Sequence, residues 1–231
     1  MREFGILTLS RYREIFTVLA DSIDKYSIPA RQKVLVTSGD AYFKKFGDVR
    51  DGWVQVKGTE PFNFSRNVNL GLFYLRGMDI LLTNDDIAFT NTVTPLIDIV
   101  DAHPHVGIVS PQVIGGVGNR LQSVDYKFTQ PLDFIISKDR LAFVCVYIRK
   151  EVIESIGLFD DRTFDGYGSE DDDYCARAIH AGFKLAVTNK VVVKHGFGDY
   201  TYSSSFRQTM GDIERDKSMR EMRQRFLEKY D

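Results

Sequence analysis

The chain has 231 residues, of which 43% are hydrophobic and 27% are charged, and its formal net charge at pH 7 is −2. This composition is typical of a soluble globular protein with one large domain or two small ones. The near-neutral charge gives no electrostatic reason to expect a nucleic acid or an anionic membrane as partner, and no apolar run reaches the roughly 18–20 residues of a membrane span. With two cysteines and no apolar signal segment, we expect a cytoplasmic protein.

Strand-like and helix-like segments alternate over the first 110 residues. Short apolar runs predict strands at Gly5–Ser10, Lys33–Ser38, Trp53–Val56, Asp79–Thr83 and Val106–Val109. Amphipathic stretches predict helices after the first, third and fourth of these strands, with apolar faces within Ile15–Ile23, Leu72–Leu75 and Val93–Val100. Strand alternating with helix predicts an α/β domain with a largely parallel sheet.

The second half of the chain is less regular. Leu141–Ile148 and Leu185–Lys194 are predicted to be strands, and Glu151–Ile156 a short helix that ends at Gly157. From about Ser204 the chain becomes strongly charged, which predicts a C-terminal helix. Its candidate apolar positions are Met210, Ile213, Met219, Met222 and Phe226. The balanced charge of this helix is typical of a solvated helix or of one that forms a homodimer, and a peripheral contact with an anionic acceptor or a membrane surface is the weaker alternative.

Four consecutive carboxylates, Glu170–Asp173, open a predicted helix that runs to about His180 and ends before Gly182. Acidic residues in the first turn are favoured by the helix dipole, but four in a row repel one another. A helix cap needs one carboxylate or two. The surplus therefore predicts a site that handles protons, a metal or hydroxyl groups, with an overfilled helix cap as the alternative.

Two further polar groups stand at the ends of predicted strands. Asn84-Asp85-Asp86 follows a buried strand, and ligands bind at the carboxyl ends of strands in open α/β sheets. A carboxylate there can hold Mg²⁺ or Mn²⁺, although two aspartates can also form only a turn. A lone histidine is more often structural than a ligand, but the position of His195 at the last strand end, before Gly196, favours a ligand. Sequence patterns of P-loop, serine-hydrolase and zinc-protease sites are absent.

In order and spacing, these segments resemble the core of bacterial family 2 glycosyltransferases with a GT-A fold. The segments that carry the resemblance are Pro61-Phe-Asn-Phe-Ser-Arg-Asn-Val-Asn-Leu-Gly, Ile80-Leu-Leu-Thr-Asn-Asp-Asp-Ile, Gly157-Leu-Phe-Asp-Asp, Glu170-Asp-Asp-Asp-Tyr-Cys-Ala-Arg and the strand that ends at His195. The resemblance implies one Rossmann-like domain over residues 1–203, with a mixed, mainly parallel central sheet flanked by helices. Within it, residues 1–110 would bind the nucleotide sugar and residues 111–203 would form the acceptor and catalytic half, followed by a C-terminal helical extension over 204–231.

The resemblance also implies roles for individual residues. Asp86 and His195 would bind a divalent cation, Mn²⁺ or Mg²⁺, and Asp171 would be the catalytic base with Glu170 beside it. The implied contacts with the donor nucleotide come from Ser10, Arg11, Asp40, Arg66, Asn69, Asn84 and Asp85. The implied contacts with the acceptor come from Tyr167, Gly168 and Asp173. Three segments depart from the family pattern. Asn84 replaces an aspartate, Thr37-Ser38-Gly39-Asp40 replaces the usual end of the second strand, and Gly115–Ser137 matches only loosely.

The function implied is sugar transfer from a nucleotide-sugar donor, foremost a UDP-sugar, to the hydroxyl of a glycan, a lipid-linked molecule or another acceptor. A direct displacement with inversion needs a carboxylate to take the proton of the hydroxyl, and neighbouring anions would raise the pKa of Asp171 for that task. A nucleotide-sugar-binding protein without transfer activity and a nucleotidyltransferase are the alternatives. The second would need a glycine-rich phosphate loop near Ser10, which the sequence lacks. The charge does not indicate a nucleic-acid acceptor.

Overall fold

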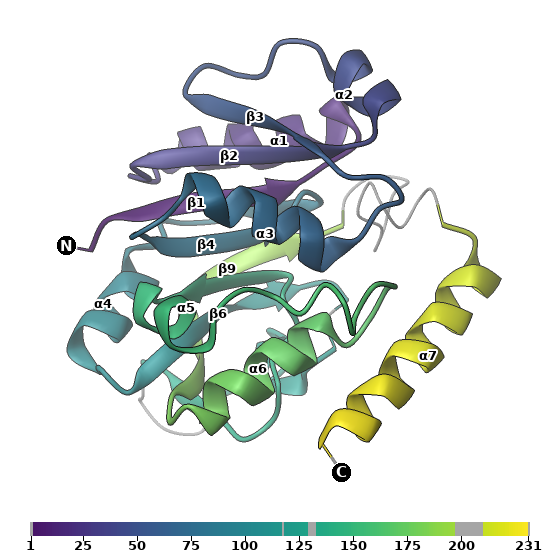
Figure 1. Ribbon diagram of the computed structural model, residues 1–231. Coiled ribbons are helices and arrows are strands. Elements are labelled where there is room, and N and C mark those ends of the chain that lie inside the picture. Colours follow the sequence, from purple (N-terminus) through teal and green to yellow (C-terminus); the bar gives the residue numbers. More distant parts are fainter. Residues whose placement is uncertain (1, 117, 129–132, 197–209, 231) are drawn as a thin grey trace.

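The computed structural model describes residues 2–116, 118–128, 133–196 and 210–230. Its centre is a nine-stranded sheet in the order β3-β2-β1-β4-β8-β6-β9-β5, with β7 also pairing with β9 (Figure 1). The strands are β1 (Phe4–Leu9), β2 (Gln32–Ser38), β3 (Trp53–Gly58), β4 (Asp79–Asn84), β5 (Ile87–Phe89), β6 (Val106–Ile114), β7 (Ile135–Ser137), β8 (Cys145–Ile148) and β9 (Lys184–His195). The helices are α1 (Arg13–Lys25), α2 (Asp40–Phe46), α3 (Phe64–Tyr74), α4 (Thr94–Ala102), α5 (Lys150–Ile156), α6 (Glu170–His180), α7 (Asp212–Tyr230) and the 3₁₀ turn η1 (Arg120–Gln122).

Helices cover the sheet on both faces. Strands β3, β2, β1 and β4 run parallel, and all six residues of β1 are buried. Side chains of α1 and α4 share one core cluster with alternate residues of β1, whereas those of α3, α5 and α6 share the other. A parallel sheet covered on both faces explains why its strands are near-continuous apolar runs in the sequence.

Strand pairing in the second half of the sheet fixes the position of the last strand end. Strand β8 runs antiparallel to both β4 and β6, and β9 runs parallel to β6. At the edge, β5 pairs antiparallel with β9 so that Ile87 stands opposite His195. Since Ile87 directly follows Asp86, this register brings the histidine to the aspartate. The mixed, mainly parallel sheet flanked by helices confirms the predicted fold class.

Several elements differ from the sequence-based prediction. The extent of α6 is confirmed, but β8 begins at Cys145 because Leu141, Phe143 and Val144 are buried by packing without joining the strand ladder. The short elements α2, β5 and β7 were not predicted, since runs of three to seven residues carry little periodic signal. The expected boundary between residues 203 and 204 lies outside the described residues. No helix in the described part of the chain is long and apolar enough to cross a membrane.

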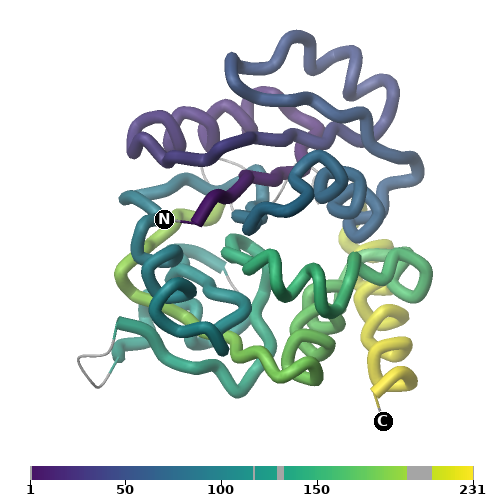
Figure 2. The backbone as a smooth tube through the Cα atoms, turned by 60° about the vertical axis from the view of Figure 1, so that its left-hand side comes forward, coloured from purple at the N-terminus to yellow at the C-terminus, as the bar shows by residue number. Residues whose placement is uncertain are grey.

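The C-terminal helix α7 lies beside α6 (Figure 2). Of its five predicted apolar positions, only Met222 and Phe226 are buried, and they pack against Phe164 of the same chain. Ile213 is 88% exposed. The buried part of this apolar face is therefore covered within the chain, and the structure offers no support for the expected homodimer.

A buried carboxylate at the start of β4 joins four parts of the chain. Asp79 is 1% exposed. It accepts hydrogen bonds from both Nε and Nη2 of Arg2, from the Tyr147 hydroxyl at 2.8 Å and from the Lys150 backbone N–H at 2.9 Å. Because this carboxylate has a partner on the N-terminal segment, β8 and α5, its charge is compensated within the protein.

Replacing Asp79 with asparagine is expected to lower the free energy of unfolding by roughly 2–3 kcal/mol, because the Arg2 charge and the Tyr147 hydroxyl lose their charged partner. Urea denaturation measures the loss. The exposed Asp98 on α4 provides a matched control, and Asp98→Asn should change the free energy by less than about 0.5 kcal/mol. Equal effects of the two substitutions would contradict this role of Asp79.

Candidate functional site

The ends of β1 and β4 bring together two residues that were predicted to bind the nucleotide sugar. Leu9 and Asn84 are paired in the sheet, so the next residues, Ser10 and Asp85, leave the same edge together. The Ser10 hydroxyl donates to Asp85 Oδ2 at 2.6 Å. Both side chains are buried, and Asp85 is only 1% exposed. The hydrogen bond fixes the orientation of the Asp85 carboxylate at the carboxyl end of the sheet.

Asp86 presents a buried carboxylate just after the end of β4. It is 1% exposed, and neither of its side-chain oxygens has a hydrogen-bond partner within the described residues. The Nε2 atom of His195 lies 3.4 Å from Asp86 Oδ2. A buried carboxylate without hydrogen bonds is costly, so a cation at this position would stabilise it.

The opposite edge of the His195 ring is held by the backbone that follows β6. A carbonyl oxygen only accepts hydrogen bonds, so in the contact with Gly116 the Nδ1 atom must carry the proton and donate it. In the neutral ring, Nε2 then turns a lone pair toward Asp86. Gly115 permits this approach, because its φ is +112° and an added Cβ atom would lie 2.4 Å from the His195 carbonyl oxygen.

The pair fits a divalent cation. Two donor atoms that each lie about 2.1 Å from one ion can be at most about 4.2 Å apart, and the separation of 3.4 Å satisfies this limit. A histidine that donates its second ring N–H to a carbonyl is also the usual arrangement of a metal-ligating imidazole. The described residues contain no group of three or more histidine, cysteine or acidic side chains able to hold a metal. Asp86 and His195 would therefore supply only part of the ligand set.

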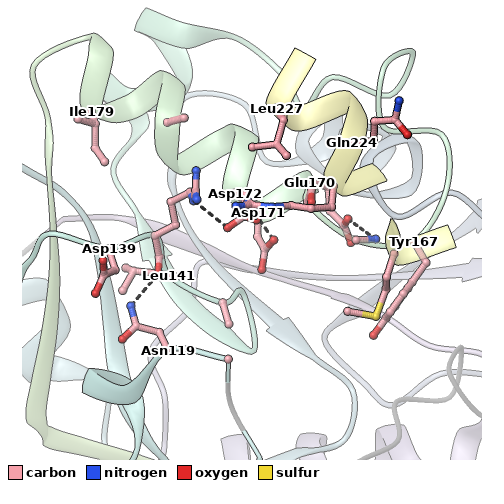
Figure 3. Close-up of a pocket in the computed structure, with 18 of the residues that line it drawn as sticks. Asn119, Asp139, Leu141, Tyr167, Glu170, Asp171, Asp172, Ile179, Gln224 and Leu227 are labelled. Carbon is pink, nitrogen blue, oxygen red and sulfur yellow. Dashed lines mark hydrogen bonds and ion pairs between the residues drawn. The ribbon is translucent and has the colours of Figure 1, made fainter. Parts of the chain in front are cut away.

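A cavity of about 1350 Å³ lies beside the acidic start of α6 (Figure 3). It is bounded by η1, by residues 138–142, by the first turns of α6 and by one face of α7. The lining includes Glu170 and Asp171 together with Tyr167 and Gly168. The structure thus brings four residues predicted to be catalytic or to bind the acceptor to one cavity.

The two carboxylates at the inner wall are held by backbone N–H groups. Glu170 accepts from Gly168 at 2.7 Å, and Asp171 accepts from Phe143 at 3.3 Å through Oδ2 and from Asp172 at 2.9 Å through Oδ1. Burial raises the pKa of both groups, and the negative charge of the next carboxylate along the chain raises each further. Asp171 is therefore a stronger base than an ordinary aspartate.

The other two members of the acidic run serve the structure. Asp173 is 1% exposed and does not line the cavity. Its carboxylate accepts hydrogen bonds from Arg177 Nε at 2.9 Å and from Lys229 Nζ and the Tyr230 hydroxyl at 2.8 Å each. Asp172 forms ion pairs with two arginines, Arg140 and Arg223. Asp173, which was expected to contact the acceptor, therefore anchors α7 beside α6 instead.

The predicted nucleotide contacts Arg11 and Asp40 lie in different surroundings. The Arg11 guanidinium lies over the rings of Tyr42 and Phe62, 4.7 and 5.4 Å from their centroids. Its side chain also donates to Ser38 and Glu60. Asp40 is exposed and pairs with Lys57. Arg11 is therefore packed among aromatic rings near the ends of β1 and β2, whereas Asp40 has the contacts of an ordinary surface residue.

Two other residues that were predicted to bind the nucleotide sugar connect α3 to a later loop. The side-chain amide of Asn69 donates to the Phe159 carbonyl and accepts from the Phe159 N–H, both at 2.9 Å. Arg66 is partly exposed and lies 3.5 Å from Asp161. These contacts give Asn69 a structural role that the sequence did not indicate.

One backbone segment links the acidic pocket to the strand ends. Phe143 donates its N–H to Asp171, and the carbonyl of the next residue, Val144, accepts from the Asn84 N–H at 2.9 Å. The residues that sequence reasoning missed are Gly116, Arg140, Arg223, Lys229 and Tyr230. They act through contacts between distant parts of the chain, for which a single sequence carries no signal.

No protein-family model and no curated protein sequence matches the chain. Among solved structures, GalNAc-T7 with UDP, GalNAc and Mn²⁺ has a TM-score of 0.69 at 11% identity, covering 89% of this chain and 46% of that one. The structure of S. aureus TarS has a TM-score of 0.58 at 14% identity over 84% of this chain and 37% of that one. The TarS fragment 1–349 has a TM-score of 0.58 at 13% identity over 98% and 72%.

The chain thus spans less than half the length of GalNAc-T7 and of the longer TarS structure. At identities this low, the likeness shows the fold alone. The sheet order, the helices on both faces and these superpositions together establish that the chain has the GT-A fold of glycosyltransferases.

Proposed function

We propose that the protein is a metal-dependent glycosyltransferase that moves a sugar from a nucleotide-sugar donor, foremost a UDP-sugar, to an acceptor hydroxyl. The observation that carries the proposal is the buried Asp86 carboxylate with His195 beside it, at the carboxyl edge of a GT-A sheet. The solved structure of GalNAc-T7 with UDP, GalNAc and Mn²⁺ supports the choice of donor and metal.

On the donor side, Asp86 and His195 hold a divalent cation, Mn²⁺ or Mg²⁺. When bound, this cation supplies positive charge that stabilises the leaving diphosphate. Asp85, held by the Ser10 hydroxyl, is oriented to accept hydrogen bonds from ribose or sugar hydroxyls. The positively charged guanidinium of Arg11 lies near the same strand ends.

On the acceptor side, Asp171 is the general base. The acceptor oxygen attacks the anomeric carbon, its proton passes to the Asp171 carboxylate, and the bond between the anomeric carbon and the diphosphate oxygen breaks. A single displacement of this kind inverts the anomeric configuration. The side chain of Glu170, turned to the Gly168 N–H, helps to hold the pocket wall in place. The acceptor is a glycan, a lipid-linked molecule or another hydroxyl compound.

A screen of UDP-, GDP- and dTDP-sugars with Mn²⁺ and a panel of hydroxyl acceptors tests the proposal. Acceptor-dependent release of the free nucleoside diphosphate is the expected result. Tight nucleotide binding without release would identify a binding protein. Release of pyrophosphate from a nucleoside triphosphate and a sugar phosphate would identify a nucleotidyltransferase.

The transfer rate should fall on acidification at a pH above the ordinary aspartate pKa of about 3.9. Asp171 accepts a proton only when it is deprotonated, so raising its pKa moves the acidic limb of the rate profile to higher pH. Besides burial, the Asp172 charge is one cause of the raised pKa of Asp171. Asp172→Asn removes this charge and should move the acidic limb to lower pH. Measuring kcat against pH for both proteins tests the assignment, and an identical limb in the two would contradict it.

A further inference from the structure

The cavity beside Asp171 carries more positive groups than its carboxylates can pair with. Among the described residues, five arginine or lysine side chains and four carboxylates line it, in a chain whose formal net charge is −2. Arg140 and Arg223 share a single partner, Asp172. The three remaining cations form no ion pair with a side chain of the described residues, and they are Arg120, Lys138 and Arg220.

These three cations reach the cavity from three different elements. Arg120 belongs to η1, where its guanidinium lies 5.9 Å from the centroid of the Tyr126 ring. Lys138 lies in the segment after β7, and Arg220 lies on α7. All three are exposed to solvent. An anion in the cavity can therefore meet positive charge from several directions without desolvating a buried cation.

The carboxylates of the lining do not cancel this charge. Glu170 and Asp171 form the inner wall, where burial raises the pKa of both and so disfavours their charged forms. Asp139 is the one remaining carboxylate among the described lining residues, and it adjoins Lys138 in sequence. Three of the four carboxylates thus lie at the start of α6, whereas the three remaining cations come from other elements.

We propose that the acceptor carries a phosphate group, which binds among Arg120, Lys138 and Arg220 while the reacting hydroxyl lies at Asp171. This inference rests on the proposed transfer function. A phosphate presents several charged oxygens, which match cations that approach from different sides better than a flat carboxylate does. Because these three cations lie on elements other than α6, the phosphate binds away from the start of α6 and the uncharged hydroxyl end faces Asp171.

Calorimetry with glucose 6-phosphate, diglycerol phosphate and neutral glucose as probes tests the anion site. UDP and Mn²⁺ are present in excess, so that the donor site does not take up the phosphate probes. Both phosphate probes should bind at least about tenfold more tightly than glucose, and the double variant R220Q/K138Q should lose about tenfold or more of that preference. Lys184→Gln, an exposed lysine at the opposite end of β9 from His195, should retain it.

Transfer assays with the same probes as acceptors separate the two proposals. If the phosphate preference disappears in the double variant while no donor of the screen releases its nucleotide, the anion site stands and the transfer function fails. If nucleotide is released with equal kcat/KM for phosphorylated and neutral acceptors, in wild type and double variant alike, transfer stands and the phosphate acceptor is refuted. A preference that survives unchanged in the double variant would also overturn the assignment. A preference for glucose 6-phosphate alone identifies a phosphate monoester on the acceptor, and a preference for diglycerol phosphate alone identifies a diester.

Discussion

Asp171→Asn is expected to lower kcat for sugar transfer by a factor on the order of 10²–10⁴, the usual contribution of a general base. Asparagine keeps the shape of the side chain and can still accept from the Phe143 N–H, but it cannot take the proton of the acceptor hydroxyl. Binding of UDP with Mn²⁺ should change by less than about twofold, because Asp171 lines the acceptor cavity and not the Asp86 end of the site. Initial rates and calorimetry measure the two effects separately.

The neighbouring Asp172 supplies the matched control. It lies on the same turn of α6, but its carboxylate forms ion pairs with Arg140 and Arg223 and takes no proton in the proposed reaction. At neutral pH, Asp172→Asn should therefore lower kcat by less than about tenfold. Transfer by Asp171→Asn at the wild-type rate, or equal losses in the two variants, would show that Asp171 is not the base.

Asp86→Asn should abolish the response to metal while leaving the fold intact. In the presence of EDTA, we expect the free energy of unfolding to rise by about 1 kcal/mol, because a buried carboxylate without hydrogen bonds becomes a neutral amide. In the wild type, Mn²⁺ should raise the melting temperature, since a ligand that binds only the folded state stabilises it. This shift should disappear in the variant, together with transfer, by a factor on the order of 10³.

The exposed Asp98 is again a suitable control, because Asp98→Asn should retain both the Mn²⁺ shift and transfer. The stability change distinguishes a metal ligand from a structural aspartate. A buried aspartate that held the fold together would lose stability on substitution, as we expect for Asp79. Lower stability of Asp86→Asn in EDTA, with an unchanged Mn²⁺ shift, would contradict the metal site.

The parts of the molecule that could be predicted are those encoded locally. Apolar runs located the buried strands, because a strand covered on both faces has few polar positions. The acidic first turn and Gly182 marked both ends of α6 correctly. The polar residues after β4 were expected at a functional edge, and the structure brings Asp85 into contact with Ser10, which the resemblance had implied as a donor contact.

What could not be predicted depends on contacts between distant parts of the chain. Asp173 has the same sequence context as Asp171, yet one is buried under Lys229 and Tyr230 while the other lines the cavity. Asp171 and Asp173 lie on different faces of α6, and the position of α7 decides which of these faces is covered. In the same way, the pairing of the Asn69 amide with the Phe159 backbone joins residues 90 positions apart and could not be read from the sequence.

Titration of UDP into the wild-type protein, once with Mn²⁺ and once with EDTA, tests the central claim most directly. The claim is that Asp86 and His195 hold a divalent cation that binds the diphosphate of a nucleotide sugar. We expect UDP to bind at least about tenfold more tightly with Mn²⁺ than with EDTA. Equal affinity in the two buffers, or no binding of UDP in either, would contradict it.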